Sequence, residues 1–199
     1  MPDLPPADAE TLALLTPAAV PALTAGGGDA YGRLVVRGGG DAEGKRLLSD
    51  LDPADLLLKP PARRDAAAAV LAGLWLWHDW LDESHRLSQE IHNPTGSYWH
   101  AVMHRREGDF WNSKYWYAKC RGHPAHARAA ALAKPIVAAS TAVEAKRFAG
   151  GWDPDALVDL AEAADGKPAG DPARQLAVAL QRAEWSALFA ETVRQAAGG

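Results

Sequence analysis

The sequence is poor in the features that stabilise secreted or membrane proteins. Cysteine occurs once, at Cys120, so the chain cannot form an internal disulfide, which favours a reducing compartment. No apolar run approaches the roughly 20 residues that span a bilayer, since the longest extends only from Ala66 to Trp77. The N-terminal sequence MPDLPPADAE is acidic and rich in proline, unlike a signal peptide. We therefore expect a cytoplasmic protein with no membrane-spanning segment.

An excess of positive charge is also missing. The formal net charge is -4, so nucleic acid is not an expected partner. With 199 residues and 48% hydrophobic composition, the chain is long enough to bury one substantial core. We expect a single domain over residues 1–199, with a loop-rich helical part at 1–60, a core rich in His, Trp and Arg at 61–124, and C-terminal helices at 125–199.

Signals for β-structure are scarce, and only RLVV at 33–36 resembles a strand. Helix starts are marked more clearly, by Asp-Pro pairs that begin at Asp52, Asp153 and Asp171. Aspartate accepts hydrogen bonds from the first amides of a helix, and proline at the first helical position loses none. The helices predicted from these pairs cover about 53–58, 154–165 and 172–196. We expect a mostly α, bundle-like fold with long irregular loops.

The longest predicted element is one central helix from about Arg63 to Ile91, which only Gly73 interrupts. Such a helix places five polar side chains within an arc of about 80°. These residues are His78, Asp82, His85, Gln89 and His92. A buried polar stripe must be hydrogen-bonded or bind a ligand. The alternative is that the stripe is the solvated face of a helix whose other sides are buried.

Two histidines in the next predicted helix have a spacing that suits a metal ion. Ser97 is the predicted N-cap of this helix, which covers 98–106, and Asp109 is the predicted cap of the helix that follows. His100 and His104 are spaced i, i+4, which allows two imidazoles to reach one ion. A divalent metal is one interpretation, whereas acid–base chemistry or a hydrogen-bonded histidine pair are the others.

The chain around these histidines is locally basic. The segment NPTGS at 93–97 leads into a helix N-terminus, where free amides and two hydroxyl groups form a cradle for phosphate or carboxylate. Ordinary surface ion pairs would explain the same charges. We expect a small anionic ligand here. The candidate substrate-binding residues are Thr95, Ser97, Arg105, Arg106, Asn112, Lys114, Tyr115, Trp99 and Gln89.

The segment PTGSYWHAVMHRREGDFWNSKYW, with LDESHRLSQ upstream and GHP downstream, resembles an uncharacterised family of bacterial and fungal proteins. Its members share the pattern PTGS-x-WH-x2-MHRRE-x-D-x2-N-x-KYW, and this sequence keeps each named position. The resemblance covers roughly Leu74 to Pro124. It implies a natural functional module, and the family brings no established activity with it.

Together these patterns predict a small-molecule enzyme that acts on a phosphorylated, carboxylated or sugar-like substrate, with a divalent metal as the candidate cofactor. The candidate catalytic residues are His85, His104, Glu107 and Asp82, and the candidate metal ligands are His100, His104 and His85. A non-catalytic ligand-binding protein or a helical scaffold that uses the same residues is the alternative.

Overall fold

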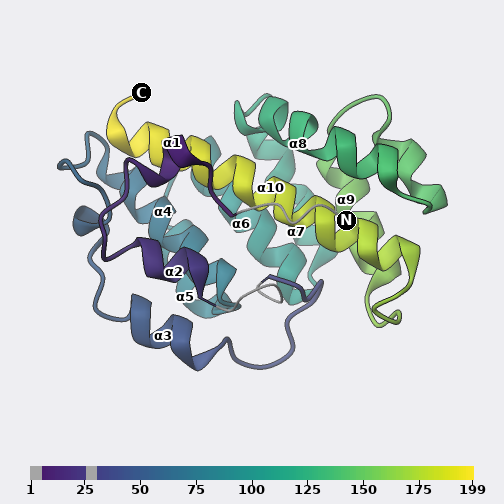
Figure 1. The fold of residues 1–199 in the computed structure, drawn as a ribbon, viewed down its shortest axis with the longest axis horizontal. Coiled ribbons are helices and arrows are strands. Elements are labelled where there is room, and N and C mark those ends of the chain that lie inside the picture. Colours follow the sequence, from purple (N-terminus) through teal and green to yellow (C-terminus); the bar gives the residue numbers. More distant parts are fainter. Residues whose placement is uncertain (1–5, 26–30) are drawn as a thin grey trace.

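The computed structural model describes residues 6–25 and 31–199 as helices joined by loops (Figure 1). The helices in chain order are α1 (Ala9–Leu12), α2 (Val20–Thr24), α3 (Ala42–Leu48), η2 (Pro53–Asp55), α4 (Arg64–Trp77), α5 (Leu81–Ser88), α6 (Pro94–Glu107), α7 (Phe110–Tyr117), η3 (Ala118–Cys120), α8 (Ala125–Ala139), η4 (Val143–Phe148), α9 (Pro154–Ala164) and α10 (Pro172–Ala197). No strand is present within the two described ranges, so the prediction of a mostly α fold is confirmed. The segment 33–36, which resembles a strand in sequence, forms none, because the chain bends at Leu34 and Val35. Instead, the Val36 amide donates to the Arg106 carbonyl at 2.7 Å.

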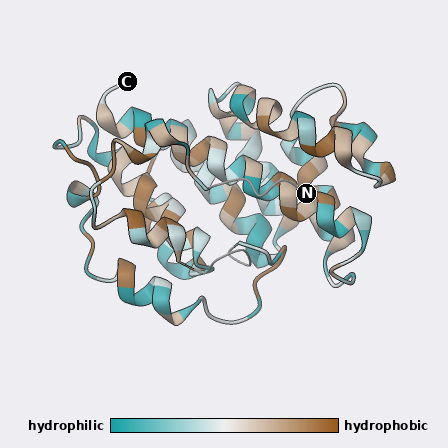
Figure 2. Cartoon of the chain, in the orientation of Figure 1, coloured by the Kyte–Doolittle hydropathy of each residue, from teal (hydrophilic) through white to brown (hydrophobic). Residues whose placement is uncertain are grey.

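Helix α10 crosses the whole molecule in Figure 1 and packs on α4, α8 and α9. Its C-terminal half, with Trp185 and Phe189, belongs to one group of buried apolar side chains that includes α4 and α6. Its N-terminal half, with Leu176 and Leu180, belongs to a second group with α9 and η4. Figure 2 shows α3 coloured mainly as hydrophilic, and Leu48 at its end belongs to the first of these groups.

The Asp-Pro pairs begin helices as predicted. The carboxylates of Asp153 and Asp171 accept hydrogen bonds from the first amides of α9 and α10. Both helices have bounds within a residue or two of those expected. Asp52 caps a helix in the same way, but this helix is the single 3-10 turn η2.

The predicted helix from Arg63 to Ile91 is in fact two helices. Helix α4 ends at Trp77 and α5 begins at Leu81, with Asp79 between them at a φ of 62°. Aspartate is among the few residues that adopt this left-handed conformation at modest cost. Its carboxylate forms ion pairs with Arg106 and with Arg33. Tertiary contacts at this junction therefore override the helical propensity of the surrounding sequence.

The start of α6 also differs from the prediction. The N-cap is Asn93, whose side chain accepts a hydrogen bond from the Gly96 amide at 3.0 Å, and Pro94 is the first helical residue. Ser97 lies inside the helix and is not a cap. Asp109 caps α7 as predicted and accepts from the Asn112 amide at 3.1 Å. In the part of the chain that the structure describes, no helix combines the length and apolarity needed to cross a membrane.

Candidate metal centre

Three histidines from two consecutive helices converge on one point. His85 comes from α5, and His100 and His104 come from α6. One ring nitrogen of each lies within 4.8 Å of the others. The Nε2 atoms of His85 and His100 are 3.1 Å apart. Two nitrogens bound to the same tetrahedral zinc ion would be about 3.3 Å apart, given zinc–nitrogen distances of about 2.0–2.1 Å. The cluster therefore needs only small side-chain movements to enclose an ion.

Local sequence accounts for this convergence. His100 and His104 are one helical turn apart, so both side chains lie on the same face of α6. Their rings are stacked, with centroids 4.6 Å apart. A short connection ending at Asn93 and Pro94 joins α5 to α6, and this turn brings His85 against the same face. The His85 and His104 ring centroids are 5.5 Å apart.

Glu107 determines which nitrogen of His104 is available. Its Oε1 lies 2.5 Å from His104 Nδ1, and a carboxylate can only accept here, so Nδ1 carries the hydrogen. The lone pair of His104 is then on Nε2, where Asn112 Nδ2 lies 3.1 Å away. Metal-binding histidines are typically oriented by a carboxylate in this way. Glu107 is thus placed to position a ligand.

His100 is the most enclosed member of the cluster. Only 5% of its surface is exposed, and its ring stacks on Trp116 with centroids 4.1 Å apart. Burial, with the neighbouring His104, His85 and Lys119, lowers the pKa of His100 to about 3. Its ring is therefore neutral at physiological pH, and a neutral imidazole is the form that binds a metal. Its Nδ1 atom is buried and has no hydrogen-bond partner among the described residues.

The remaining polar residues of the predicted stripe do not join this cluster. Asp82, Gln89 and His92 are exposed. His78 is buried elsewhere, where its ring lies 2.7 Å from both Asp41 Oδ2 and the Ala22 carbonyl. The break at the α4–α5 junction separates His78 from α5, so the residues no longer share one helical face. A second group of potential ligands combines His104 with Glu107 and the exposed Asp109.

The two arginines predicted to bind an anion both form ion pairs within the protein. Arg105 and Arg106 are both fully buried. The Arg105 guanidinium lies 2.6 Å from Glu184 Oε2 on α10, and Arg106 pairs with Asp79 and lies over the Tyr31 ring. Their charges are thus neutralised within the protein. Neither can reach a ligand without breaking a buried ion pair.

Other candidate substrate-binding residues are dispersed. Thr95 is buried and hydrogen-bonded to His123 and Gln195, so it offers no hydroxyl to an anion. Trp99 is fully buried. The remaining three are nearer to solvent: Ser97 is half-buried, Lys114 pairs with Asp159, and Tyr115 is exposed. Of the nine predicted residues, Asn112 is the one whose side chain forms a hydrogen bond with a ring of the histidine cluster.

Sequence reasoning did not single out Trp116 and Lys119 as parts of the site. Trp116 stacks on His100, and the Lys119 ammonium lies 4.3 Å from the Trp116 ring centroid. The spacing of these two residues on consecutive turns was a usable signal. Beside them, Trp111 and Tyr115 form an exposed stacked pair with an interplanar angle of 9°.

Comparison of the chain with family models, with curated proteins and with solved structures finds no match. The function is therefore argued from the geometry of the site.

Proposed function

We propose that this chain is a metal-dependent enzyme whose divalent transition metal, with zinc favoured, is bound by His85, His100 and His104. The observation that carries the proposal is the convergence of three imidazole nitrogens within 4.8 Å, together with the carboxylate of Glu107 on His104 Nδ1. Three histidine ligands with a fourth position left for water or substrate are typical of catalytic zinc sites. Structural zinc sites are usually closed by four protein ligands.

The donor set indicates the kind of chemistry. Three neutral imidazoles leave the charge of a divalent ion uncompensated, so the ion acts as a strong Lewis acid. Glu107 fixes the His104 tautomer, and Asn112 lies where it can contact a ligand beside His104. We expect hydrolysis of a small anionic ester or phosphoester, with the substrate anion drawn to the ion. The buried free thiol of Cys120 agrees with a reducing, cytoplasmic location, which is part of the proposal.

The test is elemental mass spectrometry on protein purified without a histidine tag. We expect close to one metal ion per chain in the parent, and its loss in the His100→Ala and His104→Ala variants. His92→Ala is the matched control, because it removes an exposed histidine near the site. Metal-loaded parent should hydrolyse nitrophenyl phosphate, and the His100→Ala variant should not. A parent that binds no metal, or binding that survives both substitutions, would contradict the proposal.

A structural role is the second candidate, and one observation favours it. The 3.1 Å contact between His85 and His100 and the Asn112 amide on His104 already form a hydrogen-bonded cluster. In a non-catalytic helical scaffold, replacing His100 would lower the melting temperature equally with and without added zinc. For a metal centre, zinc should raise the melting temperature of the parent and not that of the variant.

A further inference from the structure

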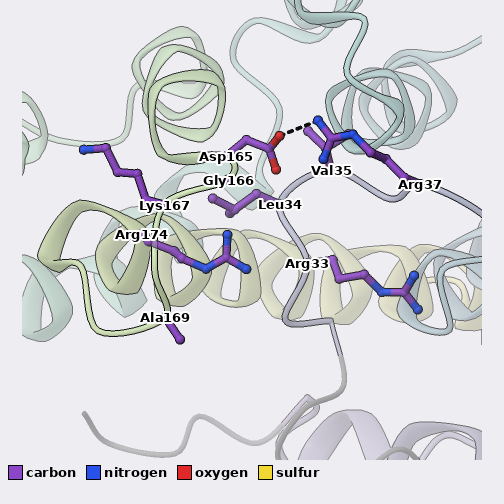
Figure 3. Close-up of a pocket in the computed structure, with 9 residues that line it drawn as sticks. All are labelled: Arg33, Leu34, Val35, Arg37, Asp165, Gly166, Lys167, Ala169 and Arg174. Atoms are coloured by element: carbon purple, nitrogen blue, oxygen red, sulfur yellow. Dashed lines mark hydrogen bonds and ion pairs between the residues drawn. The ribbon is translucent and has the colours of Figure 1, made fainter.

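A cavity of about 340 Å³ lies apart from the histidine cluster (Figure 3). It is bounded by the non-helical segment 33–37, by the loop 165–169 between α9 and α10, and by Arg174 in the first turn of α10. Its volume is at the lower end of the range of about 300–1,000 Å³ that is usual for small-molecule sites. None of the proposed metal ligands lines it. The cavity is therefore a separate candidate site.

The charged side chains that line this cavity are mostly cationic. Four of them are basic, Arg33, Arg37, Lys167 and Arg174, and one is acidic, Asp165. The whole chain has a net charge of -4, whereas the residues that line the cavity carry an excess of positive charge. A concave surface lined by one sign of charge attracts ligands of the opposite sign.

The lining carboxylate does not neutralise this charge. Asp165 forms an ion pair with Arg37 at 2.5 Å, on the upper side of the cavity in Figure 3. Arg174 enters from α10 below this pair, with its guanidinium group directed into the space between the two loops. Among residues 6–25 and 31–199, no carboxylate forms an ion pair with Arg174. Its charge is thus available to a ligand.

The other two cations are only partly neutralised. Arg33 lies 2.9 Å from Asp79, but the same carboxylate also pairs with the buried Arg106. Lys167 reaches Asp171 at the longer distance of 3.7 Å. The Ala173 and Arg174 amides at the start of α10 are not free to bind an anion, because the Asp171 side chain already accepts from them.

We propose that this cavity binds the phosphate group of a small phosphorylated molecule. Arginine guanidinium groups match phosphate oxygens in a bidentate geometry, and two arginines from different segments can hold one phosphate. Leu34 and Val35 also line the cavity and provide an apolar surface for the carbon skeleton of the ligand. Arg174 and Arg37 are the principal phosphate ligands, and Arg33 and Lys167 add to the attractive field. This site is independent of the proposed metal centre.

Calorimetric titration of the full chain at constant ionic strength tests the proposal, with ribose 5-phosphate, inorganic phosphate and ribose as probes. We expect ribose 5-phosphate to bind and ribose not to bind. Phosphate that binds as tightly as ribose 5-phosphate would indicate that the free anion is the ligand of the same site. The Arg174→Gln variant should bind at least about tenfold more weakly, because it loses a charge-assisted contact.

A second variant moves the affinity in the opposite direction. Asp165→Asn removes the carboxylate that competes for Arg37, so we expect binding of ribose 5-phosphate to tighten at least about threefold. Arg121→Gln is the control, because it removes an exposed arginine outside the cavity. The proposal is overturned if neither phosphate probe binds at about 10 mM, or if Arg174→Gln and Arg121→Gln weaken binding equally.

Discussion

Two hydrogen bonds hold His123 in its neutral form, because one ring nitrogen accepts a hydrogen bond and the other donates one. Its Nδ1 accepts from the Ala125 amide at 3.2 Å, so Nε2 carries the hydrogen and donates to Thr95 Oγ1 at 3.0 Å. The Thr95 hydroxyl in turn donates to Gln195 Oε1 at 2.8 Å, which connects α6 to α10. A second proton on His123 would break the bond to Ala125. Burial lowers the pKa of His123 to about 4.

This arrangement predicts a loss of stability in mild acid. The ordinary histidine pKa is 6.5, so between pH 6.5 and about 4 the unfolded chain binds a proton that the folded chain does not. The free energy of unfolding should therefore fall as the pH falls through this window, by up to about 3 kcal/mol from this residue, and the decline should end below it. Burial also lowers the pKa values of His100 and His126, so both add to the slope. Urea denaturation between pH 7 and 4 measures it.

The control for this effect is a pair of histidine variants. His123→Gln removes the titrating group, so its stability should depend less steeply on pH than that of the parent, by up to about 1.4 kcal/mol per pH unit. His92→Gln removes an exposed histidine and should leave the parent profile unchanged. An unaltered slope in His123→Gln would show that other groups cause the acid sensitivity.

At the scale of helices, the approach of α4 to α6 depends on Gly73. A Cβ atom at this position would lie 2.7 Å from the ring of Trp99, closer than van der Waals contact allows. Trp99 cannot move aside easily, because it is fully buried and its Nε1 donates to Thr192 on α10. The Gly73 carbonyl also accepts from Trp185 Nε1 at 3.0 Å. One small residue thus allows three helices to meet.

Gly73→Ala is expected to destabilise the protein although alanine is the better helix former. The gain in helix propensity is about 1 kcal/mol, and the steric cost in a packed core is about 1–3 kcal/mol. The clash should dominate, since the side chain opposite is rigid. Chemical denaturation measures the difference. Gly150→Ala, where no atom lies within 4 Å of the new Cβ, is the matched control. An equally stable or more stable Gly73→Ala variant would contradict this account of the packing.

The helices that were predicted accurately are those whose starting points are determined by neighbouring residues in the sequence. Helices α9 and α10 begin at Asp-Pro pairs, and the capping hydrogen bonds involve residues two or three positions away. The break between α4 and α5 instead depends on residues far away in the sequence. It depends on Asp79 meeting Arg33 and Arg106, and nothing in the sequence around Asp79 indicates these partners.

The same distinction applies to the candidate site. His100 and His104 could be paired from their spacing alone, because a helix places them on one face. His85 was placed on the preceding helix, a short loop away from them, and it reaches them because the α5–α6 connection is short. Arg105 was expected to bind an anion, whereas it pairs with Glu184, which lies far along the chain on α10. Ion pairs between residues so far apart along the chain cannot be predicted from a single sequence.

At the scale of the whole molecule, one buried ion pair connects α6 to α10. Arg105 on α6 and Glu184 on α10 are both fully buried, 2.6 Å apart. The hydroxyl groups of Tyr117 and Tyr98 donate to Glu184 Oε1 at 2.8 and 3.2 Å. The pair therefore brings α6, α7 and α10 to one polar point inside an apolar interior, and α6 also carries His100 and His104.

Removing one charge of this pair should lower the free energy of unfolding more than removing both charges. Arg105→Met leaves a buried carboxylate without its cation, and Glu184→Gln leaves a buried guanidinium without its anion. Each should lower the free energy of unfolding by about 3–5 kcal/mol. In the double variant both charges are absent, and the glutamine oxygen still accepts from Tyr117, so we expect a smaller loss than in either single variant. Urea denaturation of all four proteins gives the coupling energy. Additive losses would show that the two residues act separately.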